Sequence, residues 1–307
     1  MGQLLSHQSG LPLGTIGPPS EYAPGSSMPT ARQFIETDAR LVAEPGSGFA
    51  YSDVGFNMLQ LAVESVTGES FAGYMQRAVL APLGMEDSSY AWQETYAGAL
   101  ATGYEINGTP VEPYVYPAGA SGGLLADVDD LARFVAAEVA DAAGVLSADS
   151  IDAMHEERVE IPGLYGFVAD GYAYGHFIER LSDGRTAVWH GGQGHGWMTH
   201  FHAVPDTGDG IVVLTNSQRS WPFLAHVLTD WARWSGVGTV NFGLITRATT
   251  FVWALIALLG AVTLWRIGRL VVGLVRGSRQ VAPFSQSGAL KRAVQFVVGG
   301  LLLALVE

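Results

Sequence analysis

The chain has 307 residues, of which 48% are hydrophobic and 15% are charged, so it is long and apolar enough to bury a sizeable core. Its formal net charge is −13, but residues 1–242 hold nine basic and 28 acidic residues, a net charge of −19. Such a surface repels polyanions and argues against nucleic acid as a partner. The absence of cysteine excludes disulfides and thiolate metal sites.

The basic residues are 15 arginines and a single lysine, Lys291. An acidic, nearly lysine-free domain is typical of a high-salt habitat, where carboxylates keep a surface hydrated. A GC-rich genome also favours arginine, and the sequence leaves both explanations open.

The first half of the chain predicts helices separated by loops. Residues 13–30 are rich in Gly, Pro and Ser and predict a loop, and residues 45–48 predict a turn. A helix is expected from a cap at Ser52 or Asp53 to about Val66, ended by Gly68. Further helices, which show apolar residues at helical spacing, are expected over residues 69–80, 127–143 and 149–155.

The hydrophobic period changes to two in the second half. Strands over residues 172–180 and 186–190 flank a Ser-Asp-Gly turn, and strands over 197–204 and 211–216 flank a Pro-Asp-Thr-Gly turn. An amphipathic helix over residues 221–234 has the length to cover this sheet. The pattern predicts an α+β fold, an antiparallel sheet flanked by helices.

The C-terminal part predicts a membrane tail. Residues 248–265 carry no charge and as a helix would be about 27 Å long, close to the thickness of a bilayer core. A buried core helix is the alternative. Residues 266–292 are basic and are expected in the cytoplasm, which places residues 1–242 outside the cell. Residues 293–306 predict a second, partial transmembrane helix, so the tail is residues 243–307.

Several segments share the order of a known family. They are Leu-Leu-Ser-His-Gln-Ser-Gly-Leu-Pro at 4–12, Tyr-Ser-Asp-Val-Gly-Phe at 51–56, Ala-Pro-Leu-Gly-Met at 81–85, Ser-Gly-Gly-Leu at 121–124, Asp-Leu-Ala-Arg-Phe at 130–134 and His-Gly-Gly at 190–192. Together they resemble the serine β-lactamase-like family, which includes class C β-lactamases, D-alanyl-D-alanine carboxypeptidases and related esterases. The resemblance implies a β-lactamase/transpeptidase-like fold for residues 1–242.

The resemblance assigns catalytic roles to Tyr51, Asp53 and His190. A serine hydroxyl is a poor nucleophile until a base takes its proton. Tyr51 would be that base as a phenolate, which requires nearby cations because free tyrosine titrates near 10. Asp53 stands where β-lactamases have Asn, and its carboxylate only accepts hydrogen bonds. His190 would donate a hydrogen bond to the substrate.

Substrate-binding roles fall to Gly191, Gly192, Ser121 and Gly122. The glycines of the His-Gly-Gly segment would let a substrate backbone lie along a strand edge. Residues 119–123 also read Gly-x-Ser-x-Gly, so an α/β-hydrolase esterase with Ser121 as nucleophile is an alternative. That reading requires a buried strand before Ser121, and residues 113–117, with a proline at each end, are a poor central strand.

The nucleophile that the family requires is absent from this sequence. Family members carry a serine three residues before a lysine, whereas the residue three before Lys291 is Gly288. We therefore expect a serine hydrolase of an ester, amide or peptide whose chain, as given, lacks its N-terminal part and is inactive. A non-catalytic binding remnant is the alternative from another class.

No cofactor or metal is expected. His190, His195, His200 and His202 lie close in sequence, but their spacing matches no common zinc pattern.

Overall fold

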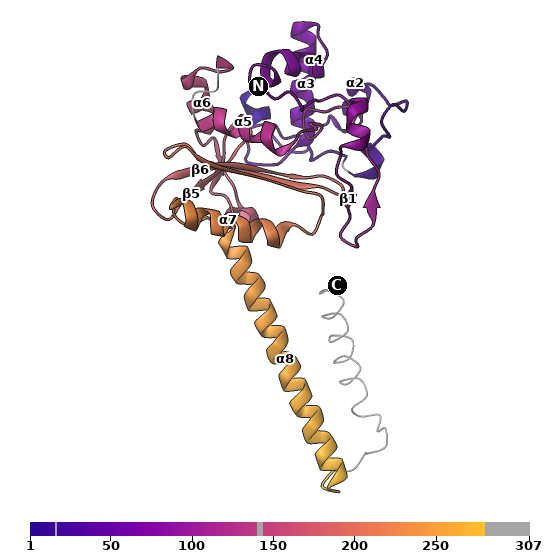
Figure 1. Ribbon diagram of the computed structural model, residues 1–307, viewed down its shortest axis with the longest axis vertical. Coiled ribbons are helices and arrows are strands. Elements are labelled where there is room, and N and C mark those ends of the chain that lie inside the picture. The colour runs from indigo at the N-terminus through magenta and orange to yellow at the C-terminus, as the bar shows by residue number, and fades with distance from the viewer. Residues whose placement is uncertain (16, 140–143, 280–307) are drawn as a thin grey trace. The chain divides into compact units, whose positions relative to one another are not determined.

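The structure is a computed structural model that describes residues 1–15, 17–139 and 144–279. The chain divides into a compact unit over Met1–Thr249 and a second unit that begins at Thr250 (Figure 1). The predicted domain boundary at residue 242 stays a prediction.

The first unit contains a six-stranded sheet in which every neighbouring pair is antiparallel and the strand order follows the sequence. The strands are β3 (Val159–Glu160), β4 (Gly171–Tyr172), β5 (Phe177–Arg180), β6 (Thr186–Gln193), β7 (Met198–Val204) and β8 (Asp209–Thr215). The predicted antiparallel meander is confirmed.

The sheet is covered on both faces by helices. On one face, α7 (Trp221–Ser235) buries Leu228 and Trp231 in the largest apolar cluster, which also holds Trp189 of β6. On the other face, Val135 of α5 (Val128–Val139) packs against Val188 of β6. Figure 1 shows the sheet between α7 and the helical layer that contains α5.

The first unit also contains the following elements outside the main sheet. They are α1 (Gly2–Leu5), η1 (Pro18–Ser20), α2 (Ala31–Asp38), α3 (Asp53–Thr67), α4 (Phe71–Met75), η2 (Gln76–Leu80), η3 (Glu94–Gly98), the hairpin β1 (Gly103–Tyr104) and β2 (Pro110–Val111), α6 (Ala148–His155) and η5 (Gly163–Phe167).

Helix α3 begins and ends as its sequence predicts. The Ser52 hydroxyl accepts the backbone N–H of Gly55 at 3.0 Å, which satisfies one of the free donors of the first turn. Gly68 follows the last turn at φ 72°, the left-handed conformation that favours glycine.

Three element predictions need correction. Residues 172–180 are not one strand, because the N–H of Ala173 bonds to the carbonyl of His176 at 2.8 Å and closes a tight turn between β4 and β5. The helix expected over 69–80 starts at Phe71, since Ser70 caps it, and its last turn is a π turn. Helix α2 was not predicted, although Thr30 and Gln33 form a capping box at its start.

The remaining boundaries agree within a few residues or lie outside the described part. Strand β6 continues three residues beyond His190, and α5 ends at Val139, while the predicted extension over residues 140–143 lies outside the described residues.

Helix α8 (Gly243–Val275) contains the uncharged run at residues 248–265. Its 33 residues correspond to about 50 Å of helix, which is long and apolar enough to cross a membrane, and none of its most apolar window is buried. The second expected segment at residues 293–306 lies outside the described residues.

Candidate active site

The structure brings together Tyr51 and His190, which are far apart in the sequence. Tyr51 directly precedes the cap of α3, and His190 lies on β6, 139 residues later. The Tyr51 Oη and His190 Nε2 atoms are 3.5 Å apart. The first turn of a helix and the end of a strand thus form one site, which sequence order alone does not reveal.

Hydrogen bonding fixes the protonation of this pair. His190 Nδ1 lies 3.0 Å from the carbonyl oxygen of Gly191, so Nδ1 carries the proton that it donates there. In the neutral ring Nε2 is then an acceptor, and Tyr51 donates to it. Burial, followed by the charge of His176, lowers the pKa of His190 to about 4. Burial, followed by the charge of Asp53, raises the pKa of Tyr51, so both groups are neutral near pH 7.

Asp53 is the first residue of α3, where the helix dipole favours a negative charge. Burial outweighs this effect and raises the pKa of its carboxyl to about 6. The side chain lines a small pocket with Phe34, Asp38 and Asn57, between α2 and α3. Among the described residues it makes no side-chain hydrogen bond to Tyr51 or His190, so it acts on Tyr51 through charge.

Two buried polar side chains of α3 hold the Ser-Gly-Gly loop beside the helix. Gln60 Oε1 accepts the backbone N–H of Gly119 at 2.9 Å, and Asn57 Oδ1 accepts that of Ser121 at 3.2 Å. Ser121 and the adjacent Gly122 therefore lie along the helix that begins after Tyr51. Asn57 and Gln60 were not predicted as site residues from the sequence. Their spacing from Asp53, four and then three residues along one helical face, was the signal that could have found them.

The surroundings of Ser121 do not form a nucleophile elbow. Residues 113–117 contribute only an isolated bridge between Val115 and Tyr22, and the main sheet is antiparallel throughout. Within the described residues, the Ser121 hydroxyl makes no hydrogen bond to a histidine. The elbow requires a strand leading into the serine and a histidine base, so this alternative is not supported.

The edge of β6 is open next to His190. Strand β5 pairs with β6 only as far as Phe177 opposite Trp189, so residues 190–193 have no strand partner on that side. Gly191 and Gly192 both lie in this unpaired stretch. A free strand edge presents backbone N–H and C=O groups to an extended ligand.

Gly192 is also fixed by packing. A Cβ atom at this position would lie 2.4 Å from Thr199 Oγ1 of the paired strand β7. The sequence suggested that a glycine at position 192 allows substrate access to the strand edge. The steric contact with Thr199 is a second reason for a glycine at this position.

His7 is a site-lining residue that sequence analysis placed in a motif but gave no role. It is buried, and its Nδ1 accepts the backbone N–H of Ser52 at 3.0 Å. Its ring lies 4.0 Å from that of Tyr51 and 4.7 Å from that of Tyr172, measured between centroids. Burial, followed by the charge of His190, lowers the pKa of His7 to about 3, so it supplies no positive charge to Tyr51.

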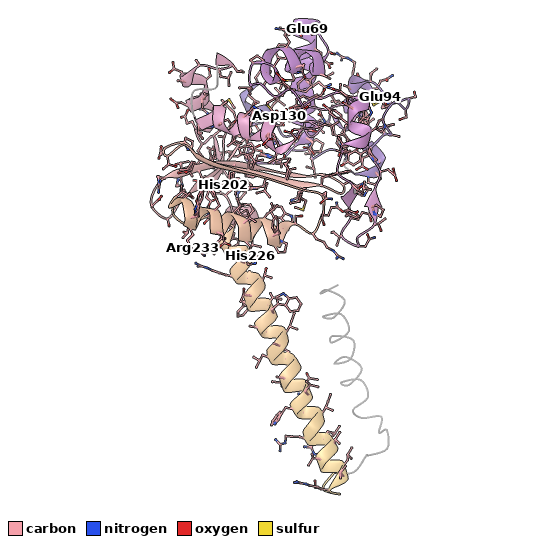
Figure 2. The ribbon with its side chains drawn as sticks, viewed as in Figure 1. Glu69, Glu94, Asp130, His202, His226 and Arg233 are labelled. Atoms are coloured by element: carbon pink, nitrogen blue, oxygen red, sulfur yellow. The ribbon has the colours of Figure 1, made fainter. Side chains whose placement is uncertain are left out.

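The four histidines between residues 190 and 202 occupy different settings. His190 contacts Tyr51, while His195 lies between the carboxylates of Glu21 and Glu105 at 2.8 and 3.0 Å. Nε2 of His200 and Nδ1 of His202 lie 3.5 Å apart, and both side chains, which belong to β7, are buried. Figure 2 labels His202.

Replacing Gly192 with Ala should destabilise the unit by about 1–3 kcal/mol, because the added methyl group overlaps Thr199. The double variant Gly192→Ala, Thr199→Ala should recover most of this loss. Gly122→Ala is the matched control, since a Cβ there meets no atom within 4 Å. Urea unfolding followed by tryptophan fluorescence measures the free energy of unfolding of all three variants. Equal losses of stability in Gly192→Ala and Gly122→Ala would contradict the steric account.

Comparisons with known proteins place this arrangement in a family. The Beta-lactamase family matches residues 1–229. Penicillin-binding protein 4 of Amycolatopsis lactamdurans is 25% identical over 244 residues, 75% of this chain and 62% of that protein. D-alanyl-D-alanine-carboxypeptidase/endopeptidase AmpH of Escherichia coli (strain K12) is 26% identical over 225 residues, 70% of this chain and 57% of that protein.

A solved structure of the octameric penicillin-binding protein homologue from Pyrococcus abyssi matches with a TM-score of 0.59 and 27% identity, over 74% of this chain and 55% of that one. The chain thus spans little more than half the length of these relatives. With its family match, its β-lactamase/transpeptidase-like fold and its motifs in family order, the chain belongs to the Beta-lactamase family of serine hydrolases.

Proposed function

We propose that this chain is part of a membrane-anchored serine hydrolase that cleaves an ester or amide through an acyl-enzyme. The observation that carries the proposal is the pairing of Tyr51 and His190 at the open edge of β6. In the proposed reaction, a serine oxygen attacks the substrate carbonyl while Tyr51 takes the serine proton and passes it to the leaving group. Water then hydrolyses the acyl-serine ester.

Tyr51 needs a cation to act as this base. Burial and Asp53 both raise its pKa, and no cation among the described residues lowers it. The resemblance to the family supplies the missing charge as the lysine of Ser-x-x-Lys, which would also bring the nucleophile. Residues 1–307 contain no such element, because their single lysine is Lys291 and Gly288 precedes it by three. We therefore propose that the chain as given binds substrate without acylation, and a binding remnant is the second candidate.

Incubation of the 307-residue chain with a fluorescent penicillin or a fluorophosphonate should leave it unlabelled on a denaturing gel. The reason is that no serine in it has a lysine at the family's spacing. A penicillin-binding protein that forms a stable acyl-enzyme with the same probe serves as the positive control. Labelling that disappears in Ser121→Ala would contradict this expectation and revive Ser121 as a nucleophile.

The charge of the site favours neutral substrates. β-Lactams and D-alanyl peptides carry a carboxylate, whereas Asp53 and the net charge of −19 on residues 1–242 both repel anions. Two like charges roughly 8–10 Å apart at an effective dielectric constant of about 20 repel by about 2 kcal/mol. We therefore propose short-chain neutral esters as the preferred substrate class.

In a protein that joins residues 1–307 to an upstream Ser-x-x-Lys segment, kcat/KM should be higher for a p-nitrophenyl ester than for a chromogenic cephalosporin. Asp53→Asn should shift the ratio of the two values toward the cephalosporin by about tenfold or more, since it removes the nearby charge. Glu36→Gln, on the exposed surface of α2, changes the net charge equally and should leave the ratio unchanged. A preference for the cephalosporin that ignores Asp53 would disprove the charge argument.

The membrane anchor is the second part of the proposal. Helix α8 is exposed and apolar over a membrane-spanning length, and Arg266, Arg269, Arg276 and Arg279 follow its uncharged run. The positive-inside rule then places this basic end in the cytoplasm and residues 1–242 on the outer side of the cell membrane.

The cysteine-free sequence offers a direct test of this topology. In intact cells, a membrane-impermeant maleimide should label Ser26→Cys, an exposed loop position, and should label Ser278→Cys, which follows α8, only after permeabilisation. The unmodified chain is the control, because it has no thiol. Labelling of Ser278→Cys alone from outside would reverse the orientation, and equal labelling of both in intact cells would exclude a spanning helix.

A further inference from the structure

Three potential metal ligands meet on the side of the unit formed by α5, α6 and the β4–β5 turn. Glu138 lies on α5, His155 is the last residue of α6, and His176 lies in the turn before β5. One ligand atom from each lies within 4.8 Å of the other two. None of these residues takes part in the proposed proton transfer, although the charge of His176 lowers the pKa of His190.

The cluster contains buried polar atoms that have no hydrogen-bond partner in the part of the chain that the structure describes. Glu138 is 8% exposed and His176 is 4% exposed, so both are essentially inside. Within the described residues, the second carboxylate oxygen of Glu138, Oε2, has no hydrogen-bond partner, and neither does His155 Nε2. A buried polar atom left without a partner costs about 1–3 kcal/mol, so native proteins rarely gather two of them at one place without a ligand.

The orientation of His176 points its lone pair into the cluster. Its Nδ1 lies 3.0 Å from the backbone carbonyl of Tyr174, so this nitrogen carries the donated proton. Nε2 then faces Glu138 Oε1 at 2.9 Å, as an acceptor unless a cation occupies it. Burial lowers the pKa of His176, but the charge of Glu138 and the hydrogen bond with it raise this pKa overall, so Nε2 favours a bound cation, either a proton or a metal ion. Two acceptors at this distance repel unless a cation lies between or beside them. A carbonyl on the far nitrogen is also the usual means of orienting a metal-binding histidine.

We propose that Glu138, His155 and His176 bind a divalent transition-metal ion of the zinc type, with water in the fourth position. Zinc bonds of about 2.0–2.1 Å in a tetrahedron place neighbouring ligand atoms about 3.4 Å apart. The separations here, from 2.9 Å to at most 4.8 Å, bracket this value, so small side-chain rotations complete the geometry. Two imidazoles and one carboxylate suit zinc, whereas magnesium and calcium prefer oxygen ligands alone.

Such an ion would act as a structural cross-link. It would tie two helices of the helical layer to the turn that leads into β5, and hence to the sheet. The alternative occupant is a proton on His176, which converts the His176–Glu138 contact into an ion pair. In that case His155 takes no part in the interaction. The two explanations differ in whether His155 matters.

The test uses the full 307-residue chain, purified in detergent without a polyhistidine tag, stripped with EDTA and dialysed. Calorimetric titration with ZnCl₂ should give one site per chain, and zinc should raise the unfolding temperature by several degrees, whereas MgCl₂ should not. His155→Ala should weaken zinc binding at least tenfold and abolish the zinc-induced shift. Because His155 Nε2 has no hydrogen-bond partner among residues 1–15, 17–139 and 144–279, the unfolding temperature of the metal-free variant should stay close to that of the parent chain.

His226→Ala is the matched control, since His226 is an exposed histidine on α7 (Figure 2). It should bind zinc as the parent chain does. Glu138→Gln, which keeps a hydrogen-bonding side chain but removes the charge, should also weaken binding at least tenfold. Cobalt titrated into the stripped parent chain should give the intense visible bands of a tetrahedral site, and these should be absent in His155→Ala.

Two results would overturn the proposal. One is the absence of stoichiometric zinc binding and of any thermal shift in the parent chain. The other is equal zinc binding by the parent chain, His155→Ala and Glu138→Gln, which would assign the metal to surface groups.

Discussion

The alternation of side chains along β6 is the constraint on which both the core and the site depend. Trp189 packs into the apolar cluster under α7, while Val188 faces α5 on the opposite side of the sheet. His190 shares the face of Val188 and therefore reaches Tyr51 in the helical layer. A register slip of one residue would turn His190 into the core and Trp189 into the site. The six residue pairs between β6 and β7 thus fix the site as firmly as they fix the core.

The chemistry of the site is limited by its lack of positive charge. The two histidines nearest Tyr51, His7 and His190, are both kept neutral by burial, and Asp53 adds a negative charge. Tyr51 is therefore a phenol that donates to His190, not a phenolate ready to accept a proton. The same burial would make an added cation strongly effective, because a charge acts over a longer range where water is excluded. The proposed hydrolase would therefore depend on the lysine of a Ser-x-x-Lys element for its chemistry.

Buried polar side chains position the loops around the site. Asn57 and Gln60 hold the Ser-Gly-Gly loop through its backbone N–H groups, and His7 holds the N–H of Ser52. Each contact joins segments that are at least 45 residues apart. Such contacts stabilise only when they are complete, since a buried acceptor left alone is costly. The cluster at Glu138, by contrast, is incomplete among the residues that the structure describes, which is the basis of the proposed metal site.

The sequence by itself determined the local elements and the family. Ser52 and Gly68 define the ends of α3, and the turn segments define the β5–β6 and β7–β8 hairpins, because caps, turns and periodicity act over a few residues. The order of the motifs identifies the fold. Only the tertiary structure decided which distant residues meet. The pairing of Tyr51 with His190 depends on strand register and helix packing, which act between segments that are remote in sequence. The same reason hid the meeting of Glu138, His155 and His176. The tight turn that splits residues 172–180 is, by contrast, a local feature that the strand pattern on either side of it concealed.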